Sequence, residues 1–109
     1  VVRNGAVMRD MLFVDDCIAA VLRLAVTPEA ANDVFNIGSG EIVSISDIAH
    51  QAIKVSGRAN VEFTDLEQNI NYSPTAIMAD ISKVLGTIDW RPRISLRDGL
   101  QRMWDSYVS

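Results

Sequence analysis

The sequence predicts an α/β protein, a small fold of about three short strands and about four helices. Short apolar runs alternate along its 109 residues with segments whose apolar side chains recur at helical spacing. Ser or Asp stands where most of those helical segments begin. With 49% apolar residues and no low-complexity tract, the chain has the composition of one folded domain or of a piece of a larger one.

The first predicted strand covers residues 9–14, and a helix follows it. Asp15 and Asp16 are expected to cap that helix, because carboxylates accept hydrogen bonds from its first N–H groups. Thr27-Pro28 ends it, since proline lacks the N–H donor and restricts the residue before it. The apolar stripe of this helix consists of Ile18, Val21, Leu22 and Ala25.

A second strand is predicted over residues 34–37, closed by a glycine turn at 38–40, with a short extended piece at 41–43. Ser44 and Asp47 then have the spacing of a helix cap, and Gly57 is a natural end for the helix that they open. One face of that helix carries Ile45, Ile48, Ala49, Ala52 and Ile53.

Residues 61–63 alternate like a short third strand, and residues 65–75 are polar without a period, which predicts a loop. Asp80 is expected to cap a short helix that ends near Gly86, and Ser95 with Asp98 repeats the capping spacing before the last helix. The predicted core face of that last helix is formed by Leu100, Met103, Trp104 and Tyr107.

Charge and composition argue against several classes of protein. A formal net charge of −4, with ten basic residues scattered among fourteen acidic ones, disfavours a nucleic-acid binder. No apolar run approaches the roughly 20 residues needed to span a membrane. Cys17 and His50 are the single cysteine and the single histidine, so an internal disulfide and a zinc site are not expected. We expect a cytoplasmic protein, and a chain that begins with Val1 is expected to be a shortened one.

The glycine turn at 38–40 imitates a dinucleotide-binding loop, since it lies between a strand and a helix. Val43 stands where a third glycine belongs, and the β-branched pair Ile42-Val43 favours extended backbone where a helix should already have begun. A turn without a cofactor is therefore the preferred interpretation.

Arg9 has two interpretations from the residues alone. Its planar guanidinium, at the start of a strand, suits a phosphate. The alternative is a surface pair with Asp10 of little energetic consequence. For catalysis, His50, Cys17 and the Asp15-Asp16 pair are each explained as well by a structural role, so no catalytic residue is assigned.

Read in order, several segments resemble the C-terminal part of the NAD-dependent epimerase/dehydratase family, the extended short-chain dehydrogenases that act on nucleotide sugars. The resemblance covers nearly the whole chain. Its segments are residues 5–16 (Gly, then Arg-Asp, then Val-Asp-Asp), residues 34–40 (Val-Phe-Asn-Ile-Gly-Ser-Gly) with 43–45, residues 79–83 (Ala-Asp-Ile-Ser-Lys) with 85–86, residues 90–92 (Trp-Arg-Pro), and residues 95–96 with 99–100.

The resemblance implies a substrate-binding lobe over residues 1–109, with the Rossmann domain that holds NAD(P) and the catalytic Tyr-x-x-x-Lys absent from this chain. It implies that Arg9 contacts the phosphates of a nucleoside-diphosphate sugar. Where the family often has an arginine before its Ala-Asp, this sequence has residues 69–74, so Asn71 or Tyr72 is expected to supply the second phosphate contact. Met11 replaces the family's aromatic residue.

Two functions follow from these observations. The first is the substrate-binding part of a nucleotide-sugar epimerase or dehydratase, an isomerase-type enzyme. This chain alone is not expected to catalyse the reaction, because it lacks the Tyr-x-x-x-Lys and the glycine-rich cofactor loop. The alternative is a stand-alone binding or interaction module derived from that lobe. In either case the helix stripes that would face a Rossmann half are exposed, which predicts self-association or a covering partner.

Overall fold

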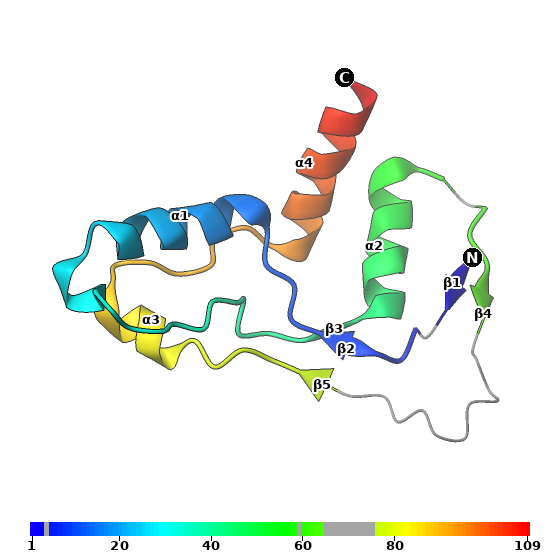
Figure 1. The fold of residues 1–109 in the computed structure, drawn as a ribbon. Helices are drawn as coiled ribbons and strands as arrows, with labels where there is room; N and C mark the ends of the chain where they lie inside the picture. The colour runs from blue at the N-terminus through cyan, green and yellow to red at the C-terminus, as the bar shows by residue number, and fades with distance from the viewer. Residues whose placement is uncertain (4, 59, 65–75) are drawn as a thin grey trace.

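The computed structural model describes residues 1–3, 5–58, 60–64 and 76–109. Within them the fold is an α/β arrangement with four α-helices, as the sequence predicts (Figure 1). In chain order the elements are β1 (Val2–Arg3), β2 (Met8–Arg9), α1 (Val14–Ala25), the 3-10 helix η1 (Pro28–Ala30), β3 (Val43–Ser44), α2 (Ile45–Ser56), β4 (Phe63–Thr64), β5 (Ala76–Ile77), α3 (Ser82–Thr87) and α4 (Leu96–Val108).

A small mixed sheet is built around β2, which lies between β3 and β5. β2 runs antiparallel to β3 and parallel to β5, so Arg9 stands opposite Val43 on one side and Ile77 on the other. β1 and β4 form a separate parallel pair. α1 and α3 lie toward one end of the molecule, and α2 lies with β1 and β4 toward the other (Figure 1).

The main apolar core joins α1 to α3 and to the segment after α3. Four buried residues form its centre: Ala20, Val84, Ile88 and Trp90. Partly buried side chains pack around them: Leu12, Ala19, Leu24, Phe35, Ile37 and Ile81. This core is small, so other contacts must contribute to holding the segments together.

All three predicted strands differ from the structure. Of residues 61–63, only Phe63 belongs to a strand, β4. Of residues 9–14, only Arg9 belongs to a strand, and α1 already begins at Val14. Residues 34–37 form no strand in the described structure, because both neighbouring positions of β2 are taken by β3 and β5. Their apolar side chains Phe35 and Ile37 pack against the core instead.

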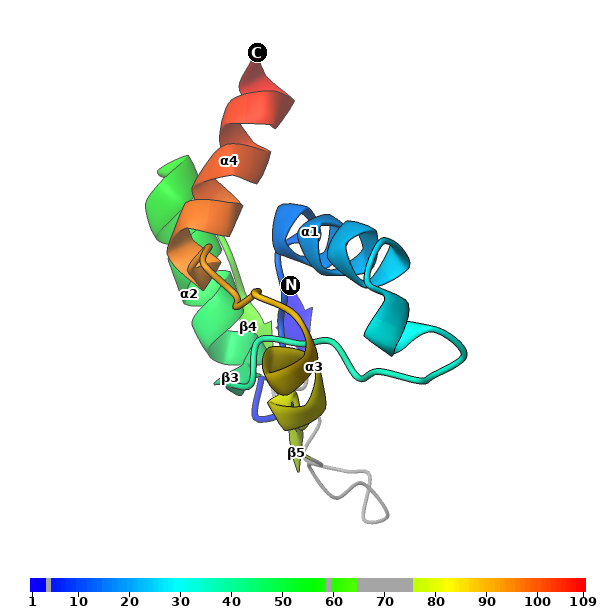
Figure 2. The same cartoon turned by 90° about the vertical axis from the view of Figure 1, so that its left-hand side faces the viewer.

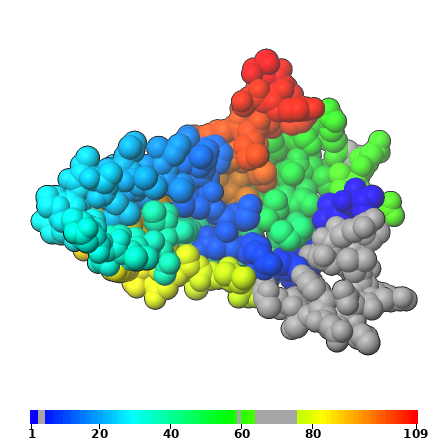
Figure 3. Space-filling model, in the orientation of Figure 1, coloured from blue at the N-terminus to red at the C-terminus, as the bar shows by residue number. Residues whose placement is uncertain are grey.

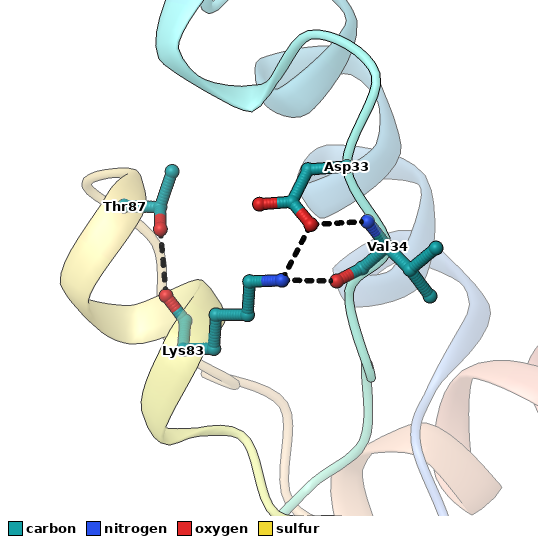
Figure 4. A network of polar contacts seen from close by, with 4 residues as sticks. All are labelled: Asp33, Val34, Lys83 and Thr87. Atoms are coloured by element: carbon teal, nitrogen blue, oxygen red, sulfur yellow. Dashed lines mark hydrogen bonds and ion pairs between the residues drawn. The ribbon is translucent and has the colours of Figure 1, made fainter.

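The segment before Phe35 is tied to α3 by a lysine. Lys83 Nζ donates to Asp33 Oδ1 at 2.7 Å and to the carbonyl oxygen of Val34 at 2.7 Å (Figure 4). Thr87 Oγ1 bonds the carbonyl of Lys83 one turn later, at 2.8 Å. Because these groups are exposed, the ion pair orients the segment and adds little stability.

The predicted helix ends are confirmed for α2 and α4. Ser44 Oγ accepts from Asp47 N at 3.0 Å, and Ser95 Oγ accepts from Asp98 N at 3.1 Å, as the Ser-x-x-Asp spacing predicts. Gly57 ends α2 with a φ of 67°, a left-handed conformation that favours glycine. These local signals fix where the helices begin and end.

The core face predicted for the last helix is only half buried. α4 packs against α2, and Leu100 and Trp104 are partly covered. Met103 and Tyr107 are 60% and 73% exposed, so their prediction as core residues is wrong. The C-terminal end of α4 projects past the other helices (Figures 1 and 2).

The outer face of α1 is apolar and uncovered. Its inner side carries Ala20 and Leu24, which reach the core, whereas its outer stripe of Val14, Ile18, Val21 and Leu22 is 50–62% exposed. The helix lies on the surface of the molecule (Figure 3). The accessible area of 7917 Å² compares with about 6000 Å² for a compact protein of 12.0 kDa. The chain therefore exposes much more surface than a compact monomer of its size.

Candidate functional site

Arg9 ends β2, the central strand of the small sheet, and its side chain is half buried. One guanidinium nitrogen, Nη1, donates to the carbonyl oxygen of Met8 at 2.7 Å. Arg9 lines a hollow of about 680 Å³ whose other walls are residues 35–38 and 77–80, with Asp10 and Leu12. The sheet thus places a cation in a hollow between two segments that are distant in sequence.

Asp10, the next residue, holds these walls together. Its Oδ1 accepts hydrogen bonds from Ser39 N at 2.7 Å and from Ser39 Oγ at 2.6 Å. Its Oδ2 accepts from Gly40 N at 3.1 Å and from Ala79 N at 3.1 Å. One carboxylate therefore joins the end of β2 to the glycine turn and to the segment after β5.

The glycine turn is shaped by this carboxylate. A Cβ atom on Gly38 would lie 2.6 Å from the Cβ of Ala79 and 2.7 Å from Asp10 Oδ2, closer than real contacts allow. Gly38 is therefore required by close approach, and Gly40 by its φ of 73°.

The same contacts argue against a dinucleotide in this turn. The N–H groups of Ser39 and Gly40, which would have to face a pyrophosphate, already donate to Asp10. The backbone then enters β3 at Val43 rather than a helix. The residues of this turn do not fit a nicotinamide dinucleotide, and the geometry favours the turn interpretation.

Burial alone would raise the pKa of Asp10, because it penalises the charged form. The hydrogen bonds from Ser39, Ala79 and Gly40 outweigh that effect and hold the pKa of Asp10 below its usual value. The ionised carboxylate is thus the form that the fold stabilises.

This pKa shift predicts a loss of stability in acid. Because the pKa of Asp10 is lower in the folded state than in the unfolded state, about 3.9, its full contribution to the free energy of unfolding is present above that unfolded value. The contribution is lost as the pH falls through the lower pKa of the folded state. Asp10→Asn should therefore flatten the decline in the free energy of unfolding below about pH 4. Urea unfolding from pH 3 to pH 7 measures the free energy of unfolding of the unmodified chain and of Asp10→Asn. An equal decline of this free energy in the two proteins at low pH would contradict the prediction.

Asp16 does not cap α1 as predicted. The N-cap position is Phe13, without a side-chain cap. Asp16 is 6% exposed, and its Oδ2 accepts from Arg93 N at 3.0 Å and from Ile94 N at 2.9 Å. Asp15 is exposed and lies 3.3 Å from Arg102 Nη1. The Asp15-Asp16 pair is thereby divided between a surface ion pair and a buried structural contact.

The other candidates lie away from the hollow or outside the described residues. Asn71 and Tyr72, the expected second phosphate contacts, fall in the range that the structure does not describe. His50 is exposed and stacks on Phe63, with ring centroids 4.5 Å apart. Cys17 is partly exposed in the first turns of α1.

Metal-binding clusters of His, Cys, Asp and Glu are absent from the residues that the structure describes. Among the same residues, each helix is too short or too polar to cross a membrane.

The sequence did not reveal the roles of Asp10 and Asp16. Both carboxylates bind backbone N–H groups that lie far along the chain, and a backbone donor leaves no mark in the sequence. The nearest signal is that each Asp stands beside an apolar segment, where an unpaired charge would be costly.

No protein-family model matches the chain. A curated relative, the CDP-paratose 2-epimerase of Salmonella typhi, is 31% identical over 104 residues, which are 94% of this chain and 30% of that protein. The GDP-L-fucose synthase 1 of Arabidopsis thaliana is 35% identical over 105 residues, 96% of this chain and 31% of that protein. The chain is a homologue of the nucleotide-sugar epimerases and dehydratases.

A solved structure of this epimerase/dehydratase group has the same fold. The UDP-glucuronic acid 4-epimerase from Bacillus cereus, in complex with NAD, superposes with a TM-score of 0.78 at 31% identity, over 95% of this chain and 31% of its own. The chain spans about 30% of the length of the curated epimerase/dehydratase relatives that it matches. The fold predicted from the resemblance is confirmed.

Proposed function

We propose that the chain is the sugar-nucleotide-binding part of an NAD(P)-dependent epimerase or dehydratase, and that Arg9 contacts the diphosphate. The observation that carries this proposal is the position of Arg9 at the hollow between residues 35–38 and 77–80. A guanidinium presents paired N–H donors that match phosphate oxygens. The names of the relatives include CDP-, GDP- and dTDP-linked sugars, and UDP-glucuronic acid is bound in a solved neighbour.

In this proposal the chain binds and does not carry out the hydride transfer. That step needs a bound nicotinamide and a positioned base. NAD(P) would be held by the part of the relatives that this chain does not match, and the glycine turn here is already occupied by Asp10. Asn71 and Tyr72 remain proposed contacts to the second phosphate.

Replacing Arg9 by alanine should weaken nucleoside-diphosphate binding. One charge-assisted hydrogen bond is worth about 1.5–3 kcal/mol, so the dissociation constant should rise about tenfold to a hundredfold. Calorimetric titration of the 109-residue chain with UDP, GDP, CDP and dTDP measures it.

Arg97→Ala is the matched control, since Arg97 is an exposed arginine on α4 and does not line the hollow. Its affinity should equal that of the unmodified chain. Equal affinities for Arg9→Ala and the unmodified chain would exclude Arg9 as the phosphate contact.

The exposed stripe of α1 supports a second part of the proposal. In a longer protein the rest of the enzyme would cover it, and in the isolated chain a second copy would cover it. The alternative function, a stand-alone binding or interaction module, is favoured by the same stripe, which would then receive a different protein. A cytoplasmic location remains an expectation from the sequence.

A further inference from the structure

We propose that Asp10 is the positioning residue of the Arg9 site, fixing the strand end that carries Arg9 against the two segments that wall the hollow. The inference rests on the proposed role of Arg9 in binding phosphate. Asp10 also lines the hollow, but both of its carboxylate oxygens already accept hydrogen bonds from protein donors, so it is not assigned as a ligand contact. It acts through the backbone of β2 and through the two segments that its carboxylate joins.

The hydrogen bonds of Asp10 connect the end of β2 to the glycine turn and to the segment after β5. The ladders of β2 with β3 and with β5 contain two residue pairs each, too few to be stable alone. Asp10 adds four bonds directly after the last pair of both ladders, two to Ser39 and one each to Gly40 and Ala79. This carboxylate therefore fixes the end of β2 against both walls of the hollow, in addition to the core packing of Phe35 and Ile37 and the bonds of Lys83 to the segment before them.

The glycine turn packs tightly against Asp10 and Ala79 at Gly38. Gly38 lies so close to Asp10 and Ala79 that even a methyl group would collide with both. An asparagine at position 10 would fit the space but has only one acceptor oxygen in its side chain. Its NH₂ group would take the place of the second carboxylate oxygen and would face the N–H donors that now bind that oxygen. Asp10→Asn should therefore shift β2 or the turn while changing the side-chain volume very little.

Asp16 provides a matched control within the same chain. It is also a carboxylate that accepts from backbone N–H groups, those of Arg93 and Ile94, and it is more deeply buried than Asp10. None of these three residues lines the hollow. Asp16→Asn should destabilise the fold in the same way as Asp10→Asn without moving Arg9.

The test compares UDP, GDP, CDP and dTDP binding by the unmodified chain, Asp10→Asn, Asp16→Asn and Arg9→Ala, at a temperature where each is folded. Asp10→Asn should weaken binding about tenfold and speed amide hydrogen exchange at residues 8–9 and 76–79, because misplacing a contact by about 1 Å is costly. Asp16→Asn should bind within about twofold of the unmodified chain, because its contacts lie elsewhere.

Each outcome separates the two proposals. If Arg9→Ala loses binding but Asp10→Asn binds like the unmodified chain, the positioning role is overturned and the phosphate site stands. An equal loss in Asp16→Asn and Asp10→Asn would show only general destabilisation and would also overturn it. An unmodified chain that binds none of the four nucleotides refutes the proposed function and this inference together.

A milder variant covers the case in which Asp10→Asn does not fold. Ser39→Ala removes one of the two bonds to Oδ1 and keeps the backbone bond. It should weaken binding about twofold to fivefold, and unchanged binding would overturn the positioning role.

Discussion

Trp90→Ala should destabilise the chain by about 3–5 kcal/mol, a large part of the roughly 5–15 kcal/mol that stabilises a folded domain. Trp90 is 5% exposed and packs against Ala20, Val84 and Ile88 at the centre of the core. Its Nε1 also donates to the carbonyl oxygen of Asp16 at 3.0 Å. Removing the ring leaves a cavity between α1 and α3 and an unsatisfied acceptor. Urea unfolding followed by circular dichroism measures the loss.

Two further variants test the contributions of the Trp90 ring, of its hydrogen bond and of its position in the core. Trp90→Phe keeps much of the apolar area and loses the donor, so it should cost less than the alanine variant. Trp104→Ala is a control of the same chemistry on the half-buried face of α4, and it should also cost less. An unfolding midpoint of Trp90→Ala equal to that of the unmodified chain would show that this cluster is not the core.

The double substitution Ile18→Glu with Leu22→Glu should convert a self-associating chain into a folded monomer. Ile18 and Leu22 are 50% and 62% exposed on the outer stripe of α1, so two charges there disturb a contact between copies without entering the core. Sedimentation velocity at several concentrations measures the change in mass.

Met103→Glu is the control for this experiment, because Met103 is equally apolar and 60% exposed but lies on α4. It should leave the association unchanged. A monomeric unmodified chain, or a double variant that still associates, would contradict the proposal that a second copy covers α1.

Features set by neighbouring residues were predictable from the sequence. Ser44 and Ser95 each bind an N–H three residues later, so their spacing alone predicted the starts of α2 and α4. Gly57 and Pro28 likewise mark the end of α2 and the end of α1, through backbone limits that act within a few residues.

Features set by distant residues were not predictable. Residues 34–37 have the composition of a strand, but a strand also needs a neighbour, and in the described structure β2 gives both its sides to β3 and β5. The partners of Asp10 lie 29 to 69 positions away, and those of Asp16 77 and 78. Arg9 could be singled out from the sequence, but the carboxylate that joins the walls of its hollow could not.

The most direct test of the phosphate site is an NMR titration of the labelled 109-residue chain with each nucleoside diphosphate. We expect saturable shifts at the amide and guanidinium groups of Arg9 and at residues 36–38 and 77–80, and we expect the shifts at these residues to be lost in Arg9→Ala. Shifts confined to α2 and α4, or shifts unchanged in Arg9→Ala, would contradict it.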